Sequence, residues 1–322
     1  MRCDRCGEDA VIHQPYAGTH LCEEHLRRSI TKRVRRRIRT DALLDADPSP
    51  EEPARWVIGL SGGKDSAVLA TILSDTFTTD PRIDLLALTI DEGIDGYRDK
   101  SVEACRELAA QLDLEHEIVG YEEEFDVRMD DVATNDRATL APCAYCGVFR
   151  RDVLDHHAKR LDADLLLTGH NLDDEAQTAL MNVLSGDVDQ MAKHFRASLA
   201  PLSARRQQEN FIPRAKPLRD IPEREVALFG HTAELPMHFA ECPHSSEAFR
   251  GEIQDILLRL EDGHPGTRHS IMAGYEQVAE LLSKSMHGGQ SPDLHPCTRC
   301  GSMTNNELCR PCEMLDAISA GA

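Results

Sequence analysis

Pairs of cysteines two residues apart are the most conspicuous chemical feature of this 322-residue chain. Eight of its eleven cysteines form four Cys-x-x-Cys pairs, at positions 3 and 6, 143 and 146, 297 and 300, and 309 and 312. Cys22, Cys105 and Cys242 stand alone. Such pairs are typical of metal sites and of redox-active thiols, and their surroundings indicate which of the two applies.

Two sets of four soft ligands lie at the ends of the chain. The first is Cys3, Cys6, Cys22 and His25, and the second is Cys297, Cys300, Cys309 and Cys312. Four such ligands at short spacing predict a closed tetrahedral Zn²⁺ site in each set. We expect both ions to be structural, because the segments are too short to fold around an apolar core. His13 and His20 are alternatives to His25 as the fourth ligand.

The cysteines in the middle of the chain have different surroundings. Cys143 and Cys146 lie just before a predicted helix that carries Arg150 and Arg151, which should lower the pKa of both thiols. Cys242 is a third thiol further along. Three soft ligands without an obvious fourth fit a [4Fe–4S] cluster with one open iron, or a nucleophile with a resolving thiol, better than closed zinc. A third zinc site and a thioredoxin-like redox pair are the alternatives, whereas we expect Cys105 in the core.

A glycine-rich segment follows the apolar run Trp56–Leu60. It reads Ser61-Gly62-Gly63-Lys64-Asp65-Ser66 and leads into a predicted helix. The glycines allow a sharp turn that points backbone N–H groups at phosphate oxygens, the helix N-terminus adds partial positive charge, and Lys64 adds a full one. The spacing differs from a Walker A loop, which has four residues between its first Gly and the Gly-Lys pair. A plain strand-to-helix turn is the alternative.

Acidic residues follow a later apolar run in the same way. The segment Gly169–Glu175 comes after a predicted strand, Leu165–Thr168, and contains Asp173 and Asp174. At the end of a strand and the start of a helix, these carboxylates are candidates to bind Mg²⁺ or to act as a general acid or base. Capping of the helix by one of them is the alternative.

The elements that must position these motifs alternate along the chain. We expect strands at Trp56–Leu60, Leu85–Ile90, Glu115–Val119 and Leu165–Thr168, and helices near residues 65–76, 97–112, 147–161 and 174–185. This alternation indicates an α/β fold with a parallel sheet, in which ligands bind at the carboxyl ends of the strands. The phosphate-binding and acidic segments both follow such an end.

Composition divides the chain into four parts. We expect an N-terminal zinc finger at residues 1–26, a basic helix and linker at 27–53, the α/β domain at 54–285, and a C-terminal four-cysteine zinc finger at 290–322, after a linker at Gly288–Pro292. Between positions 27 and 39 there are eight basic residues and no acidic one, with Ile30, Val34 and Ile38 as the apolar face. We expect this helix to contact nucleic acid, although solvated or acid-paired charges would give the same pattern.

The charge of the whole chain has the opposite sign. It has 56 acidic and 36 basic residues, a net charge of −20, and only seven lysines. An acidic, lysine-poor surface is typical of adaptation to concentrated salt, and it argues against a generally basic nucleic-acid-binding surface. We find no apolar run long enough to span a bilayer and no signal peptide, so we expect a cytoplasmic protein in which the cysteines are not in disulfides.

The motifs together carry a resemblance to known proteins. The segment Ser61–Ser66 after a first strand resembles the PP-loop of the N-type ATP pyrophosphatases, which cleave ATP between its α and β phosphates. The wider pattern resembles the PP-loop tRNA 2-thiouridine synthetases, which have a wobble-uridine (NcsA-like) and a position-54 (TtuA-like) branch. That pattern consists of Ser61–Ser66, Cys143 and Cys146, Gly169–Glu175, Arg214–Leu218, Glu241–Pro243 and Glu247–Gly251.

The resemblance implies transfer of sulfur to the C2 carbon of a tRNA uridine, with position 34 favoured. ATP would adenylate O2 and release pyrophosphate, and sulfur held near Cys143, Cys146 and Cys242 would displace AMP. The implied catalytic residues also include Asp173, Asp174 and Arg150. At Arg150 this chain resembles the wobble branch, whereas the position-54 branch tends to have Lys there. The implied nucleotide site consists of Gly59, Leu60, Ser61, Gly62, Gly63, Lys64, Asp65, Ser66, Ile90, Asp91, Gly169 and Asp174.

The resemblance also implies cofactors and partners. These are ATP, Mg²⁺, two Zn²⁺ ions, a [4Fe–4S] cluster or alternatively a cysteine persulfide, a ubiquitin-like sulfur-carrier protein and a second copy of the chain in a homodimer. Three other functions remain as alternatives: thiolation at position 54, a lysidine synthetase-like reaction, which needs no cysteines, and a non-catalytic zinc-finger RNA-binding protein.

Overall fold

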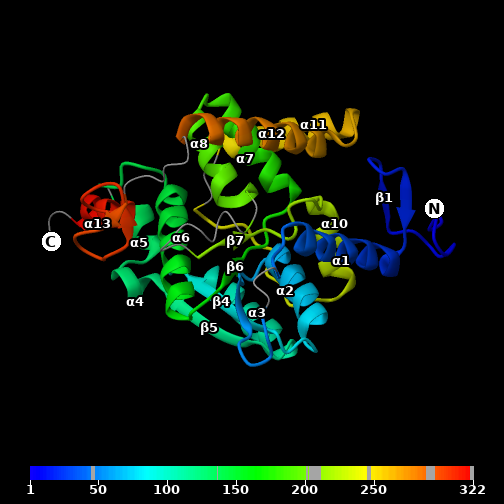
Figure 1. Cartoon of the computed structure of the whole chain (residues 1–322), viewed down its shortest axis with the longest axis horizontal. Coiled ribbons are helices and arrows are strands. Elements are labelled where there is room, and N and C mark those ends of the chain that lie inside the picture. Colours follow the sequence, from blue (N-terminus) through cyan, green and yellow to red (C-terminus); the bar gives the residue numbers. More distant parts are fainter. Residues whose placement is uncertain are drawn as a thin grey trace.

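A five-stranded parallel sheet forms the centre of the molecule, in the order β5-β4-β3-β6-β7 (Figure 1). Its strands are β3 (Ala54–Gly59), β4 (Ile83–Asp91), β5 (Glu115–Gly120), β6 (Leu165–Leu167) and β7 (Arg214–Ala215). The predicted α/β fold and all four predicted strands are confirmed, and β7 is additional. The computed structural model describes residues 1–44, 48–135, 137–200, 202, 212–244, 248–287 and 294–319, so Glu247 and the predicted linker Gly288–Pro292 lie outside the described residues.

Helices cover both faces of the sheet. Trp56 and Ile58 of β3 pack on one face against α2 (Lys64–Phe77), α3 (Arg98–Gln111) and α10 (Glu223–Thr232). Val57 points to the other face, which is covered by α4 (Tyr121–Phe125), α5 (Met129–Thr134), α6 (Pro142–Arg160) and α13 (Arg310–Ser319). Strands buried on both faces explain why the sequence shows continuous apolar runs and not an alternating pattern.

A separate group of helices lies beside β6 and β7 (Figure 1). It consists of α7 (Leu172–Leu184), α8 (Val188–His194), a π-helical turn at Phe195–Leu199, α11 (Ala248–Gly263) and α12 (Thr267–His287). Their apolar faces form a third buried cluster that includes Leu172, Met191 and Tyr275. None of the helices in the described part of the chain is long and apolar enough to cross a membrane.

The cysteine-rich segments lie at opposite ends of the molecule (Figure 1). The N-terminal one pairs β1 (Ile12–Gln14) with β2 (Thr19–Leu21) and continues into α1 (Glu23–Thr40). The C-terminal one pairs β8 (His295–Pro296) with β9 (Met303–Thr304) and continues into α13. Because α1 begins at Glu23, His25 and the basic run belong to one continuous helix.

The predicted apolar face of the basic helix is confirmed. Ile30, Val34 and Ile38 of α1 are buried, together with Leu26. Two arginines on the flanks of this face are also used inside the fold. Arg33 pairs with Glu225 at 2.8 Å, and Arg37 pairs with Asp220. Part of the positive charge in α1 therefore stabilises the fold and is not available to a partner.

The ion pair between Arg33 and Glu225 yields a stability prediction. Glu225 is only 2% exposed, so Arg33→Gln leaves a buried carboxylate without its charged partner and should lower the free energy of unfolding by about 3 kcal/mol. Arg36→Gln removes the same charge from an exposed position of the same helix and should change it by less than about 0.5 kcal/mol. Urea unfolding of both variants in concentrated salt measures the difference, and equal effects would contradict the prediction.

Candidate functional site

A cavity of about 360 Å³ lies at the carboxyl ends of β3, β4 and β6. At this point the strand order reverses, because β4 lies on one side of β3 and β6 on the other. Ligands of open α/β sheets bind at this switch point, and the volume is that of a small-molecule site. The cavity is lined by Gly59, Leu60, Ser61, Asp65, Ser66, Leu88, Ile90, Glu92, Arg98, Arg150, Leu154, Thr168, Gly169, His170 and Asp174.

The segment Ser61–Ser66 forms the predicted strand-to-helix loop. Gly63 is the N-cap of α2, and Ser66 closes the loop by donating its hydroxyl to Gly63 O at 3.0 Å and accepting from Ser61 N at 3.1 Å. Gly62 has a φ of +83°, and a Cβ there would lie 2.4 Å from Ser101 O. No other residue fits at position 62 without moving the backbone of α3.

The loop after β6 packs closely on the same helix. A Cβ on Gly169 would lie 2.7 Å from Ser66 N, so a glycine is needed where the two loops meet. Asn171 adds a side-chain hydrogen bond from Nδ2 to Asp65 Oδ1 at 3.0 Å. The phosphate-binding and acidic motifs, which are about a hundred residues apart in the chain, therefore form the two walls of one cavity.

Four residues of the predicted nucleotide site, Asp91 among them, lie beside the cavity and not on its lining. Gly62 and Gly63 form the turn, and Lys64 pairs with Asp65 at 3.0 Å and Glu223 at 2.7 Å. Although burial alone would lower the pKa of Lys64, these carboxylates raise it well above its usual value. Lys64 is thus protonated and positively charged beside the loop. Asp91 instead accepts a hydrogen bond from Gly93 N at 3.0 Å.

The two aspartates of the acidic motif have different surroundings. Asn171 is the N-cap of α7, and Asp174 completes the capping box by accepting from Asn171 N at 3.0 Å. Asp174 lines the cavity, and burial raises its pKa to about 6, an effect that Asp65 and Glu223 strengthen. Asp173 does not line the cavity. It pairs with Arg268 at 2.9 Å and accepts from Glu223 N at 2.8 Å.

The three middle cysteines come from two segments that meet at the start of α6. This helix begins at Pro142, five residues earlier than the predicted 147, so Cys143 and Cys146 belong to the helix itself. Cys143 donates to His244 O at 3.3 Å, and Cys242 belongs to the same apolar cluster as Cys146. Cys105 is buried, as predicted, and donates to Leu60 O.

The predicted low pKa of these thiols is wrong for Cys146. Burial raises the pKa of Cys146 above its usual value, against the lowering effect of Arg150. The sequence shows the helix start and the arginine but not the depth of burial. As a free thiol, Cys146 is therefore held in the protonated form, and a bound metal would be needed to make it a thiolate.

Glu92 and Arg98 are site residues that the sequence analysis did not single out. Glu92 is buried and pairs with Arg98 at 2.5 Å and with Arg150 at 2.9 Å. Arg98 also donates to Ser61 O at 2.9 Å, and Arg150 donates to Cys146 Sγ at 3.1 Å. One carboxylate therefore connects the phosphate-binding loop to a thiol. The only signal for Glu92 in the sequence was the acidic pair Asp91-Glu92, which follows the predicted strand ending at Ile90.

His170 also lines the cavity and was not predicted as a site residue. Its Nδ1 lies 2.9 Å from Thr168 Oγ1. Although the side chain keeps access to solvent, the surrounding cavity walls desolvate it and lower the pKa of His170 to about 4, and the charge of Lys216 contributes. The imidazole is therefore neutral at physiological pH and offers one donor and one acceptor to a ligand.

Both terminal cysteine sets have their ligand atoms gathered in one place. Within each set the four ligand atoms lie within 4.8 Å of one another, and the first set uses His25 in preference to His13 or His20. Cys22 Sγ is 3.2 Å from His25 Nδ1, and Cys300 Sγ is 3.4 Å from Cys309 Sγ. Among the described residues, the middle cysteines do not form such a tight group. The terminal sets suit a single ion each.

Two family models match this chain. Residues 30–242 match the PP-loop domain, and residues 2–27 match the N-terminal LIM domain of the 2-thiouridine synthetase TtuA. The first match covers the sheet and the loop Ser61–Ser66. The fold and the cavity therefore define a protein of the PP-loop class.

Relatives match over nearly the whole chain. The tRNA 2-thiolation protein NcsA of Haloferax volcanii is 62% identical over 320 residues, which are 99% of this chain and 100% of that protein. Cytoplasmic tRNA 2-thiolation protein 1 of Danio rerio is 33% identical over 100% of this chain and 89% of that protein. The solved structure of the U34-tRNA thiolase NcsA from Methanococcus maripaludis with its [4Fe-4S] cluster is 32% identical, with a TM-score of 0.80 over 98% of this chain and 95% of that chain. This chain belongs to the family of PP-loop tRNA 2-thiolation proteins.

The two loop glycines should respond differently to the same substitution. Gly62→Ala places a Cβ against the backbone of Ser101 at a positive φ and should lower the free energy of unfolding by about 3 kcal/mol. The nearest atom to a Cβ on Gly63 is 3.6 Å away, so Gly63→Ala should cost less than about 1 kcal/mol. Urea unfolding of the two variants tests this, and a Gly63→Ala effect as large as that of Gly62→Ala would refute it.

The raised pKa of Asp174 predicts a pH-dependent stability difference. A carboxyl whose pKa is about 6 in the fold and 3.8 ordinarily binds its proton more tightly when folded, so it reduces stability as the pH rises from about 4 to 6. Asp174→Asn removes this loss while keeping an oxygen that can accept from Asn171 N. The variant should match the wild type at pH 4 and have the higher melting temperature above pH 6. Melting curves in magnesium-free buffer measure the difference, and a variant less stable than wild type at pH 7 would contradict the assignment.

Proposed function

We propose that this protein is an ATP-dependent sulfurtransferase that converts a tRNA uridine to 2-thiouridine at wobble position 34. One observation carries the proposal. Arg150 lines the cavity beside the loop Ser61–Ser66 and donates to Cys146 Sγ at 3.1 Å. One arginine thus contacts both the candidate nucleotide site and a thiol. A reaction that activates a carbon with ATP and then attacks it with sulfur needs these two groups close together.

The first step activates the uridine. ATP lies with its phosphates against the loop Ser61–Ser66, where the N-terminus of α2 and Lys64 stabilise negative charge. The uridine O2 attacks the α-phosphorus, a bond from O2 to phosphorus forms, and the bond to the β-phosphate oxygen breaks with release of pyrophosphate. Asp174 lines the same cavity and is the proposed carboxylate for Mg²⁺ on the phosphates.

The second step replaces oxygen by sulfur. Sulfur attacks C2, the bond from C2 to O2 breaks, and AMP leaves with the uridine oxygen. We propose that Cys143, Cys146 and Cys242 hold a [4Fe–4S] cluster, which would supply an open iron at which sulfide can bind. Three thiols from two facing segments, spread more widely than the terminal sets, fit such a group better than a single ion. The solved NcsA neighbour carries a cluster of this kind.

Several side chains of this site act by holding others. Glu92 keeps Arg150 over Cys146 and keeps Arg98 against the Ser61 carbonyl. Arg150 can stabilise the negative charge that AMP carries as it leaves. Asp173 holds the start of α7 against α10 and α12, so we assign it a positioning role in place of the catalytic one that the sequence indicated.

The partners follow from the same proposal. A ubiquitin-like sulfur carrier would deliver sulfur, the terminal sets would bind one structural Zn²⁺ each, and the active form would be a homodimer in the cytoplasm. Position 34 is favoured over position 54 because Arg150 resembles the wobble branch and because the solved neighbour is named as a U34-tRNA thiolase.

Mass spectrometry of tRNA nucleosides tests the function. A deletion strain complemented with the wild type or with Cys105→Ala should contain 2-thiouridine at position 34, since Cys105 is buried and does not line the cavity. Strains with Lys64→Ala or Cys143→Ser should lose it, because the first lacks the loop cation and the second a sulfur ligand. The proposal would be contradicted if the Cys143→Ser strain kept 2-thiouridine at position 34. It would also be contradicted if the deletion strain lost 2-thiouridine at position 54 and kept it at position 34.

A further inference from the structure

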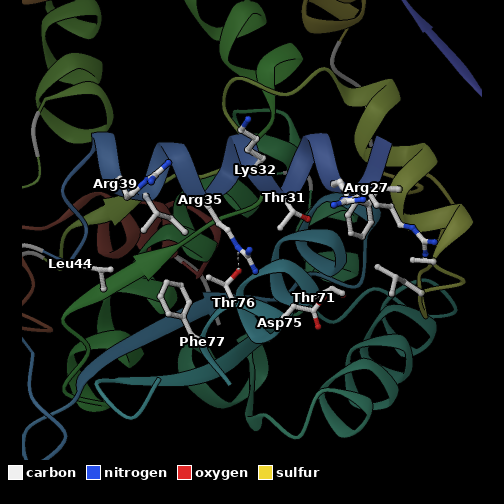
Figure 2. Close-up of a pocket in the computed structure, with 15 residues that line it drawn as sticks. Arg27, Thr31, Lys32, Arg35, Arg39, Leu44, Thr71, Asp75, Thr76 and Phe77 are labelled. Carbon is white, nitrogen blue, oxygen red and sulfur yellow. Dashed lines mark hydrogen bonds between the residues drawn. The ribbon is translucent and has the colours of Figure 1, made fainter. Parts of the chain in front are cut away.

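A groove of about 880 Å³ lies between α1, the second half of α2 and the end of α10 (Figure 2). Its basic side chains all come from α1: Arg27, Arg28, Lys32, Arg35 and Arg39. Among the described residues that line it, Asp75 is the only acidic one, and Arg35 reaches across to Thr76 at 3.2 Å (Figure 2). In a chain with a net charge of −20, this is a local concentration of the opposite sign.

The two sides of α1 divide the basic residues by function. Arg33 and Arg37 are half-buried and held in ion pairs with Glu225 and Asp220. Arg28, Lys32, Arg35 and Arg39 are exposed and recur at intervals of four, three and four residues. That spacing places one cation on each turn of a single ridge, about 16 Å long. We name these four residues the outer ridge.

The outer ridge is fixed in place, but most of its cations have no ion-pair partner among the described residues. The buried apolar face of α1 and the pairs of Arg33 and Arg37 fix the helix against α10. Arg28 pairs with Glu24 at 3.1 Å on the surface, where such a pair adds little stability. In the described part of the chain no carboxylate forms an ion pair with Lys32 or Arg39. The fold thus holds a row of four cations in place, of which only Arg28 has an ion-pair partner within the described ranges.

We propose that this groove binds the phosphate backbone of tRNA, an inference that rests on the proposed function. Evenly spaced cations on one rigid ridge can neutralise successive phosphates of one strand and release their counterions. Phe77 and Phe229 in the floor are 7% and 4% exposed, so they give bases no aromatic surface to stack on. The groove therefore recognises the backbone, and sequence is recognised elsewhere.

The position of the groove relative to the candidate site fits one bound tRNA. Both share α2, whose first residue is Lys64 and whose last turns line the groove. The α2 residues that line the groove, from Thr71 to Phe77, follow Lys64 by seven to thirteen positions, so the two sites are about 10 to 20 Å apart along the helix. They also share α10, whose Glu223 pairs with Lys64 and whose Phe229 lines the groove. A tRNA is longer than this separation, so one bound molecule can reach both sites.

Anisotropy measurements with fluorescent, unmodified tRNA and the full-length protein test the inference. The groove variant combines Arg28→Gln, Lys32→Gln, Arg35→Gln and Arg39→Gln. The matched control removes the same charge from exposed positions on α3, α11 and α12, through Lys100→Gln, Arg106→Gln, Arg259→Gln and Lys284→Gln. Titrations at several KCl concentrations give both the Kd and its salt dependence.

The groove variant should bind tRNA about tenfold more weakly or worse, and the slope of log Kd against log salt should fall by about three. The control should stay within about twofold of the wild type, and ATP affinity and melting temperature should be unchanged in both. If the quadruple variant is unstable, Lys32→Gln with Arg39→Gln, which breaks no ion pair of the described residues, provides the same comparison at half the charge.

The outcomes separate this inference from the proposed function. A wild type that binds no tRNA would overturn both. A groove variant with wild-type affinity for tRNA would overturn the groove inference and leave the proposed function intact. If that variant also lost binding to a polyglutamate peptide, the groove would be assigned to an acidic protein partner. A change in solution mass of the groove variant by light scattering would assign the groove to a contact between copies, which also overturns it.

Discussion

The arrangement of the candidate site depends on the two ion pairs of the buried Glu92 carboxylate. This carboxylate pairs with Arg98, which holds the Ser61 carbonyl, and with Arg150, which faces the Cys146 thiol. Glu92 is 4% exposed, and a buried charge left without its partners is costly, so the three groups hold one another in place. The loop that follows β3 and the start of α6 are thereby kept at a fixed separation across the end of β4.

The sheet topology makes this contact possible. Since β3 lies between β4 and β6, the segments that follow all three strands reach the same edge, and Gly62 and Gly169 allow them to approach closely.

The acidic surface constrains where the positive charge of the chain can lie. An acidic, lysine-poor surface suits concentrated salt. Against that surface, the proposed binding of tRNA depends on cations concentrated on one element, α1.

Local patterns were sufficient to predict much of the fold and part of the site. The four strands, the loop Ser61–Ser66 and the apolar face of α1 each depend on residues that are neighbours in sequence. Glu92 and Arg98 could not be predicted as a pair, because only the packing of α3 on the sheet brings them together. The early start of α6 had a local signal that went unused, Pro142 at the first helical position. The raised pKa of Cys146 had none, because burial is set by the whole fold.

If ATP activates the uridine in the cavity, as we propose, the uridine oxygen leaves with AMP. Position 34 of a tRNA can be labelled with ¹⁸O at the C2 oxygen and thiolated by the full-length protein with ATP and a sulfide source. Mass spectrometry of the released nucleotide then shows where the oxygen has gone. The account predicts one ¹⁸O in the phosphate of AMP for each 2-thiouridine formed. Unlabelled AMP, or ADP as the product, would contradict it.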